Sequence, residues 1–178
     1  MVTICKTASE KALNREVMPT PHTPQPPPAT QYQLLRAHIG QFVYEVYRGP
    51  EPGRDVELDT SLNVGHRADD CAQWLASHGA TSAVLISAWH AGGRRQEASS
   101  NLQAQAALQA QIDARGLRWL PARCLSESLQ WADDALCVFD AVTADIDAWL
   151  VTFGQAAALG VQQGATPQPI WHPAHRRV

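Results

Sequence analysis

The chain has 178 residues, 45% of them hydrophobic and 17% charged, with a formal net charge of −3. This length and balance fit one globular domain with a substantial core and exclude a chain that is disordered throughout. The slightly acidic total excludes a global basic field for nucleic acid or an anionic membrane, and no apolar run approaches the roughly 20 residues of a membrane span.

Residues 1–31 are expected to form a disordered proline-rich leader. Prolines recur from Pro19 to Pro28, and proline fixes φ and lacks the amide donor, which favours an extended polyproline conformation. Residues 1–16 contain no sustained apolar segment of the secretory type, so we expect a soluble cytoplasmic protein. Residues 32–178 are then a single α/β domain with a short C-terminal tail.

The first half of this domain is expected to begin with a short helix at 33–39. A strand with Phe42, Tyr44 and Val46 on one face follows, and a second strand at 56–59 closes a hairpin. The spacing of apolar residues then predicts a helix over 66–78, which Gly79 ends. The continuous apolar run within 81–89 predicts a central strand covered on both faces.

The second half alternates helices and strands again. Ser99 or Ser100 is expected to cap a helix that Gly116 ends, and strands are predicted at 117–122 and 135–140. Thr143 is expected to cap a last helix whose apolar stripe contains Trp149 and Phe153. A closing strand at 157–161 and an extended tail at 167–173 complete the prediction.

The predicted fold class is therefore α+β. The core order is β-α-β-β-α-β, the split pattern of ferredoxin-like sheets, with an N-terminal helix and hairpin as an extension. Because strands alternate with helices, we expect at least some parallel pairing.

The four cysteines, Cys5, Cys71, Cys124 and Cys137, form no C-x-x-C pair. This spacing argues against a disulfide framework and a zinc knuckle, and Cys71 and Cys137 are interpreted as small buried hydrophobic residues. His172 and His175, even with His66, have weak spacing for a preformed metal site. We expect no metal and no cofactor.

The best candidate for ligand binding is the loop after the central strand. It contains Trp89, His90, Gly92, Gly93, Arg94 and Arg95 and leads into a helix that carries Asn101. Glycine amides, arginines and a helix N-terminus all attract an anion, and α/β sheets often bind ligands at such a place. A solvated loop tip is the alternative interpretation, because the run matches no phosphate-binding motif.

Catalytic residues are not assigned. His90 could act as a general base near Glu97 or Asn101, but no nucleophile is paired with it, and a structural histidine is the favoured interpretation. Asp133 and Asp134 are interpreted as capping or loop residues. Among the tryptophans, Trp89, Trp119, Trp131 and Trp171 are candidates for an exposed aromatic patch.

Three short pieces of the sequence are distinctive: Ser87-Ala88-Trp89 at the end of the central strand, Asn101, and Phe153-Gly154-Gln155 after the last helix. In these residues the sequence resembles a bacterial family of unknown function, DUF3293. It departs from the family pattern at His90-Ala91 in place of Asn-Pro, at Ser100 in place of Glu, at Ala104 in place of Arg, and at Asp134-Ala135-Leu136 in place of Glu-Ser-Phe.

Three functions are compatible with these observations. The first is a non-enzymatic module that binds a protein partner, because no catalytic set is present. The second is a binder of an anionic small molecule such as a nucleotide, or an enzyme, that uses the loop after the central strand. The third is nucleic-acid binding by arginines such as Arg115, Arg118 and Arg123 together with the loop arginines.

Overall fold

The computed structural model describes residues 26, 28–49, 57–126 and 132–176 of the chain. Most of the predicted leader, and Trp131, lie outside these residues. The helices are α1 (Ala29–His38), α2 (Ala68–Ser77), α3 (Ala98–Ala114) and α4 (Thr143–Thr152). The strands are β1 (Phe42–Arg48), β2 (Glu57–Leu62), β3 (Ser82–Ile86), β4 (Trp119–Ser126), β5 (Ala132–Phe139), β6 (Ala157–Gln162) and β7 (Gln168–Trp171).

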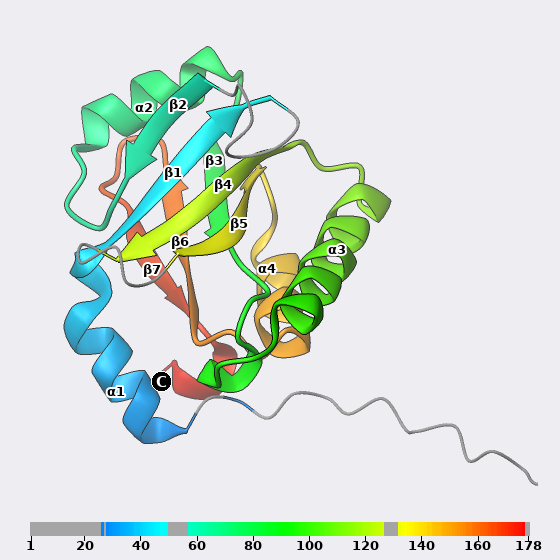
Figure 1. The fold of residues 1–178 in the computed structure, drawn as a ribbon. Coiled ribbons are helices and arrows are strands. Elements are labelled where there is room, and N and C mark those ends of the chain that lie inside the picture. The colour runs from blue at the N-terminus through cyan, green and yellow to red at the C-terminus, as the bar shows by residue number, and fades with distance from the viewer. Residues whose placement is uncertain (1–25, 27, 50–56, 127–131, 177–178) are drawn as a thin grey trace, which may run out of the picture.

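Within the described residues, the strands form one seven-stranded sheet in the order β2-β1-β4-β5-β3-β6-β7 (Figure 1). Every neighbouring pair in it is antiparallel. The expected α+β class is confirmed, and the sheet is larger than predicted. The expected parallel pairing is wrong, because the connections through α3 and α4 each skip one strand. Helix α3 joins β3 to β4 with β5 between them, and α4 joins β5 to β6 with β3 between them.

The two faces of the sheet carry separate hydrophobic clusters. On one face α2 contributes Cys71 and Leu75, which pack with Leu85 and Cys137. On the other face α3 and α4 contribute the side chains that pack on the alternate residues of β3 and β5. Side chains of a strand point to opposite faces in turn, so a fully apolar strand such as β3 needs a cover on both sides. The interpretation of Cys71 and Cys137 as buried hydrophobic residues is confirmed.

Several predicted boundaries differ from the structure. Helix α1 begins at Ala29, inside the range assigned to the leader, and the segment expected to be a plain tail pairs with β6 as β7. Ser99, Ser100 and Thr143 are not caps, since the residues at the cap positions are Glu97 and Val142. These helices begin from extended backbone without a side-chain cap, a feature that spacing alone does not show.

Helices that could span a membrane were also sought in the described part of the chain. None is both long and apolar enough to do so.

Candidate functional site

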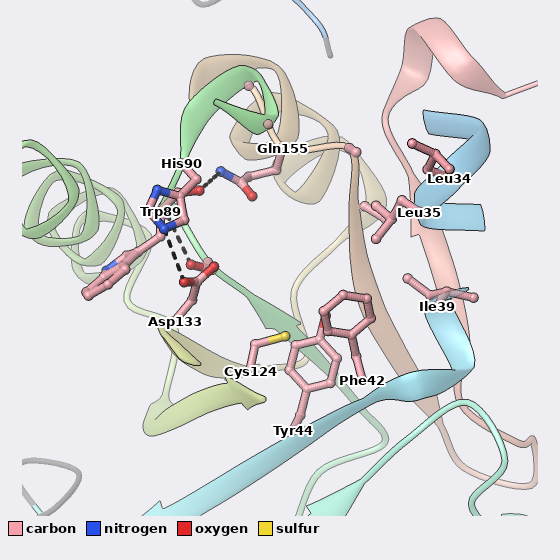
Figure 2. Close-up of a pocket in the computed structure, with 15 residues that line it drawn as sticks. Leu34, Leu35, Ile39, Phe42, Tyr44, Trp89, His90, Cys124, Asp133 and Gln155 are labelled. Carbon is pink, nitrogen blue, oxygen red and sulfur yellow. Dashed lines mark hydrogen bonds and ion pairs between the residues drawn. The ribbon is translucent and has the colours of Figure 1, made fainter. Parts of the chain in front are cut away.

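A cavity of about 260 Å³ lies on the α2 face of the sheet, beside α1 (Figure 2). One wall is apolar and consists of Leu34, Leu35 and Ile39 from α1 and the following turn, with Phe42 at the start of β1. Opposite this wall the cavity is lined by polar side chains from β1, β4, β5 and the loop after β3. Its surface is therefore divided into an apolar and a polar half.

Strand register assembles the polar half. Tyr44 on β1 is the direct partner of Cys124 on β4, and Cys124 is the direct partner of Asp133 on β5. Directly opposed residues of antiparallel strands place their side chains on the same face, about 5 Å apart. The three side chains therefore form a row that ends at the loop after β3, where His90 is located.

The phenol and the thiol in this row are both neutral at physiological pH. Burial raises the pKa of Tyr44 well above its usual value, and the neighbouring Cys124 and Asp133 raise it further. Burial also raises the pKa of the Cys124 thiol to about 12; Asp133 adds to this shift and the hydrogen bond with Tyr44 opposes it. Burial is thus the main cause of both shifts, and Asp133 makes a smaller contribution in the same direction.

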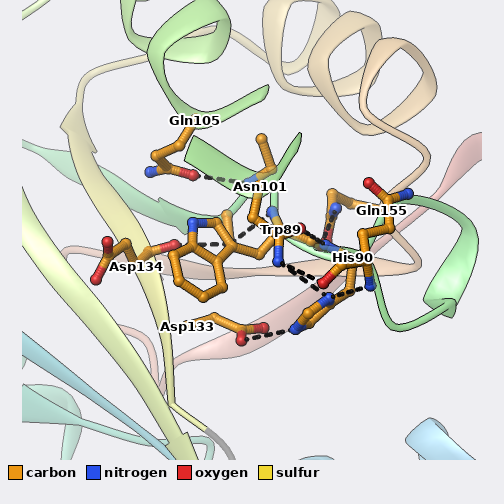
Figure 3. Close-up of polar contacts among 10 residues, drawn as sticks. Trp89, His90, Asn101, Gln105, Asp133, Asp134 and Gln155 are labelled. Atoms are coloured by element: carbon orange, nitrogen blue, oxygen red, sulfur yellow. Dashed lines mark hydrogen bonds and ion pairs between the residues drawn. The ribbon is translucent and has the colours of Figure 1, made fainter. Parts of the chain in front are cut away.

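His90 contacts this carboxylate, with its Nε2 atom 3.5 Å from Oδ1 of Asp133 (Figure 3). The other ring nitrogen, Nδ1, accepts a hydrogen bond of 3.1 Å from the backbone N–H of Gln96. Because a backbone N–H can only donate, Nδ1 carries no proton. Nδ1 is therefore an acceptor, and Nε2 is the ring nitrogen that faces Asp133.

The backbone of His90 is held in an uncommon conformation. Its φ is 55°, in the left-handed region that non-glycine residues seldom adopt. Asn101 of α3, which is 1% exposed, accepts a 2.9 Å hydrogen bond from the His90 N–H through Oδ1. Its Nδ2 faces the unprotonated Nδ1 of His90 at 3.3 Å and donates to the Gln96 carbonyl at 3.4 Å. Asn101 thus positions His90 without lining the cavity itself.

The loop is fixed from its other side by the segment after α4. The Nε2 of Gln155 donates to the Trp89 carbonyl at 2.8 Å, and the Gly92 N–H donates to the Gly154 carbonyl at 2.9 Å. Phe153 is buried among the side chains under α4. The two sequence pieces that carry the family resemblance are therefore hydrogen-bonded to each other in the fold.

The residues expected to bind a ligand are only partly brought together. Trp89, His90 and Gly93 line the cavity, and Gly92 contributes through its backbone. Arg94 and Arg95 are exposed and do not line it. Arg95 borders a neighbouring hollow that also contains Glu97 and Asp133. An anion site formed by the glycines and arginines stays a prediction.

Sequence reasoning missed Tyr44, Cys124 and Asp133 as site residues. Asp133 is 8% exposed within β5, so its interpretation as a capping or loop residue is wrong. The sequence did contain one indication that Asp133 faces the interior, because it lies two residues before Ala135, where the buried apolar residues of β5 begin. Within the described residues, no group of three or more His, Cys, Asp or Glu could hold a metal ion.

Comparison with protein families confirms the resemblance. The model of the family described as a protein of unknown function (DUF3293) matches residues 86–158. This segment contains His90, Asn101, Cys124, Asp133 and Gln155, whereas Tyr44 and α1 lie outside it. Comparisons with curated proteins and with solved structures find no match.

Proposed function

We propose that this chain, which matches DUF3293 over residues 86–158, binds a small and largely apolar organic molecule in the cavity beside α1. The observation that carries the proposal is the divided lining. An apolar wall from α1 faces a row of three hydrogen-bonding side chains, Tyr44, Cys124 and Asp133. Ligand sites in proteins have this composition, with a mainly apolar surface and a few polar groups that fix orientation.

The size of the cavity limits the ligand. A cavity of about 150 Å³ lined by apolar side chains accommodates benzene. By simple scaling, 260 Å³ has room for about ten non-hydrogen atoms. A complete nucleotide is larger than this, so the ligand is a compact molecule of the size of a single substituted ring.

The chemistry of the lining supports binding rather than covalent catalysis. Cys124, with a pKa of about 12, and Tyr44, with a raised pKa, are poor nucleophiles near pH 7. Both ring nitrogens of His90 face partners inside the protein, namely Gln96 and Asp133. No group of the polar row is thus set up as an activated nucleophile.

A fragment screen tests this proposal. Neutral, cationic and anionic fragments of about ten non-hydrogen atoms are screened by ligand-observed NMR, and hits are confirmed by thermal shift. Ala157 lines the cavity, so Ala157→Leu is expected to remove binding. Ala110→Leu, the same change on the exposed side of α3, is the matched control and is expected to keep it. Absence of hits in every charge class, or hits that bind both variants equally, would overturn the proposal.

The other sequence-based hypotheses stay predictions. Among the described residues, the exposed large apolar side chains are spread singly over the fold, at Leu34, Leu58, Leu102, Val142 and Val151. Such single residues are normal on a monomer surface and do not favour a protein-interaction module. The order β4-β5-β3-β6 with α3 and α4 on one face supports, as a further proposal, a ferredoxin-like unit inside the larger sheet.

A further inference from the structure

We infer that the ligand of this cavity carries a hydrogen-bond donor, an N–H or O–H group on a compact aromatic ring, and that this group binds the side-chain oxygen of Gln155. This inference rests on the proposed binding function and adds the chemical class of the ligand. It follows from the way in which the Gln155 amide is held, from the pairing of the donors around the cavity, and from the rings in its lining.

Both hydrogens of the Gln155 amide are used inside the protein. Its Nε2 donates to the Trp89 carbonyl at 2.8 Å and to the Phe153 carbonyl at 3.1 Å. A carbonyl oxygen can only accept, so these two bonds fix which end of the amide is the nitrogen. The oxygen, Oε1, is therefore the end that is left for a ligand, and none of the described residues donates a hydrogen bond to it.

The amide oxygen is also accessible from the cavity. Gln155 lines the cavity together with Gly154, Ala156 and Ala157, which have at most a methyl group as side chain and leave the amide uncovered. Figure 2 shows Nε2 on the side of Trp89 and the amide oxygen turned away from it. Oε1 is not one of the fully buried atoms of the described chain. Gln155 thus presents an acceptor whose orientation is set before a ligand binds.

The donors around the cavity, in contrast, are paired within the protein. Backbone N–H groups of the lining donate to internal acceptors, namely those of Trp89, His90, Gly93, Gly154 and Gln155. The Ser87 hydroxyl donates to the Asp134 carbonyl. The hydrogen bond with Tyr44 lowers the pKa of Cys124, which is the effect of a phenol that donates to sulfur, and the thiol itself is a weak donor. A ligand that supplies a donor therefore fits this lining better than one that needs donors.

One unpaired donor in the described residues lies near the cavity, the indole Nε1 of Trp89. This atom is fully buried. Figure 2 shows the Trp89 ring on the far side of His90 from the α1 wall, so the ring extends away from the cavity. A ligand between α1 and Gln155 does not reach this N–H, and the excess of acceptor over donor capacity in the cavity is unchanged.

The rest of the lining favours an aromatic body. Figure 2 shows the rings of Phe42 and Tyr44 next to each other, and Leu35 and Ile39 form part of the apolar wall. Aromatic rings attract one another in offset or edge-to-face contacts beyond the effect of buried area. A ring of about ten non-hydrogen atoms can contact these side chains while a donor on its edge meets Gln155.

Three neutral probes of nearly equal size test the inference: indole, which has a ring N–H, benzofuran, in which oxygen replaces the N–H, and quinoline, whose ring nitrogen only accepts. Their dissociation constants for the full chain are measured at pH 7 by NMR titration. The net contribution of a neutral hydrogen bond corresponds to roughly two- to tenfold in affinity, and indole should bind more tightly than either analogue by this factor. Without an acceptor the order would be reversed, because burial of an unpaired N–H costs free energy.

Two variants of Gln155 isolate the acceptor. Gln155→Glu and Gln155→Met both lose the bonds that Nε2 donates to the Trp89 and Phe153 carbonyls, so any effect on the loop is shared. The first substitution keeps an acceptor oxygen and the second removes it. Gln155→Glu is therefore expected to keep the preference for indole over benzofuran, and Gln155→Met to lose or reverse it. Gln163→Met, the same change at an exposed position outside the cavity, is the matched control and is expected to keep the preference.

The outcomes separate the two proposals. If none of the probes binds the wild-type chain, and the fragment screen also finds no ligand, the binding function itself is wrong. If benzofuran or quinoline binds as tightly as indole, or if indole does not bind although the screen yields ligands, the donor inference is overturned and the binding function stands. Equal loss of the preference in Gln155→Glu and Gln155→Met also overturns it, because Gln155 would then act only on the loop. The comparison of the three probes on the wild-type chain decides the question even if the variants do not fold.

Discussion

Replacing Asn101 tests the hydrogen-bond network that holds His90. Asn101 is 1% exposed and uses both ends of its amide, since Oδ1 accepts from the His90 N–H and Nδ2 faces the His90 Nδ1 and the Gln96 carbonyl. Asn101→Ala removes all three contacts. Asn101→Asp keeps the shape but places a carboxylate oxygen, which cannot donate, against Nδ1 and against the carbonyl.

We expect Asn101→Asp to lower stability more than Asn101→Ala, although the aspartate side chain has almost the same size and shape as asparagine. In Asn101→Ala the unpaired His90 N–H costs about 1–3 kcal/mol. Relaxation of His90 from its left-handed φ offsets about 1 kcal/mol of this, so the net loss of stability is about 0–2 kcal/mol. In Asn101→Asp two acceptor–acceptor contacts and a buried charge add to each other, and we expect a loss of about 2–4 kcal/mol. The truncation should therefore be milder than the isosteric change.

Urea unfolding followed by far-UV circular dichroism measures both losses at pH 7. Leu102→Ala is the control, because Leu102 is the next residue of α3 and is 56% exposed, and such a surface change should stay within about 0.5 kcal/mol. Imidazole ¹⁵N shifts in the wild-type chain are expected to show the proton of His90 on Nε2. If Asn101→Asp is as stable as the wild type, or more stable than Asn101→Ala, Nδ1 is protonated. The assignment of Nδ1 as the acceptor of the Gln96 N–H would then be wrong.

Three further changes test other parts of the structure. Burial raises the pKa of Asp59, but hydrogen bonds from Trp74, Arg48 and His78 outweigh this effect, and the pKa is lowered. The stabilisation by this carboxylate is therefore complete above the ordinary Asp pKa of about 4. It is lost progressively as the pH falls through the lowered pKa. Asp59→Asn should therefore flatten the acid limb of stability measured by urea unfolding between about pH 7 and pH 2, and an acid limb identical to that of the wild type contradicts the assignment. Cys124, with a pKa of about 12, should resist iodoacetamide in the native chain at pH 8 and react once urea unfolds it, as mass spectrometry of peptides would show; rapid native labelling speaks against this pKa. The side chain of Asp140, whose φ is 53°, accepts hydrogen bonds from the backbone N–H groups of Thr81 and Ser82 and from the Thr81 hydroxyl. Asp140→Ala should therefore lower the free energy of unfolding more than Asp140→Asn, which keeps an acceptor oxygen. Equal stabilities of the two variants would show that this acceptor has no role.

The sequence predicts much of the fold because hydrophobic periodicity is local. The apolar run of β3 and the alternation in β5 are typical of strands covered on both faces, and both strands are central in the sheet. Strand β7 was missed because Pro169 and short length obscure its pattern, and its pairing with β6 depends on contacts that only the folded chain provides. Local pattern likewise gives no information on which strand is inserted between two others, so the antiparallel order was not predicted.

The sequence predicted only the part of the candidate site that lies in the loop after β3. Trp89, His90 and Gly93 are neighbours in sequence, and the glycines there attract attention. Tyr44, Cys124 and Asp133 are far apart in sequence and come together through the register of three strands. Each of them separately resembles an ordinary strand residue. The polar half of the cavity is therefore a property of pairing, which a single sequence does not show.

Helix α1, which forms the apolar wall of the cavity, lies outside the residues that the family model matches. The segment matched by the family model supplies His90, Cys124 and Asp133, but the apolar wall comes from α1, outside that segment. Helix α1 is held by the C-terminal segment of the chain. The Tyr32 hydroxyl donates a hydrogen bond of 3.0 Å to the His175 carbonyl, and the rings of Tyr32 and His175 stack with their centroids 4.4 Å apart. Tyr44 of the polar half and the whole apolar wall thus lie outside the matched segment. The matched segment also begins at Ile86, the last residue of the central strand β3, so the cavity is assembled from the match together with the segments that flank it.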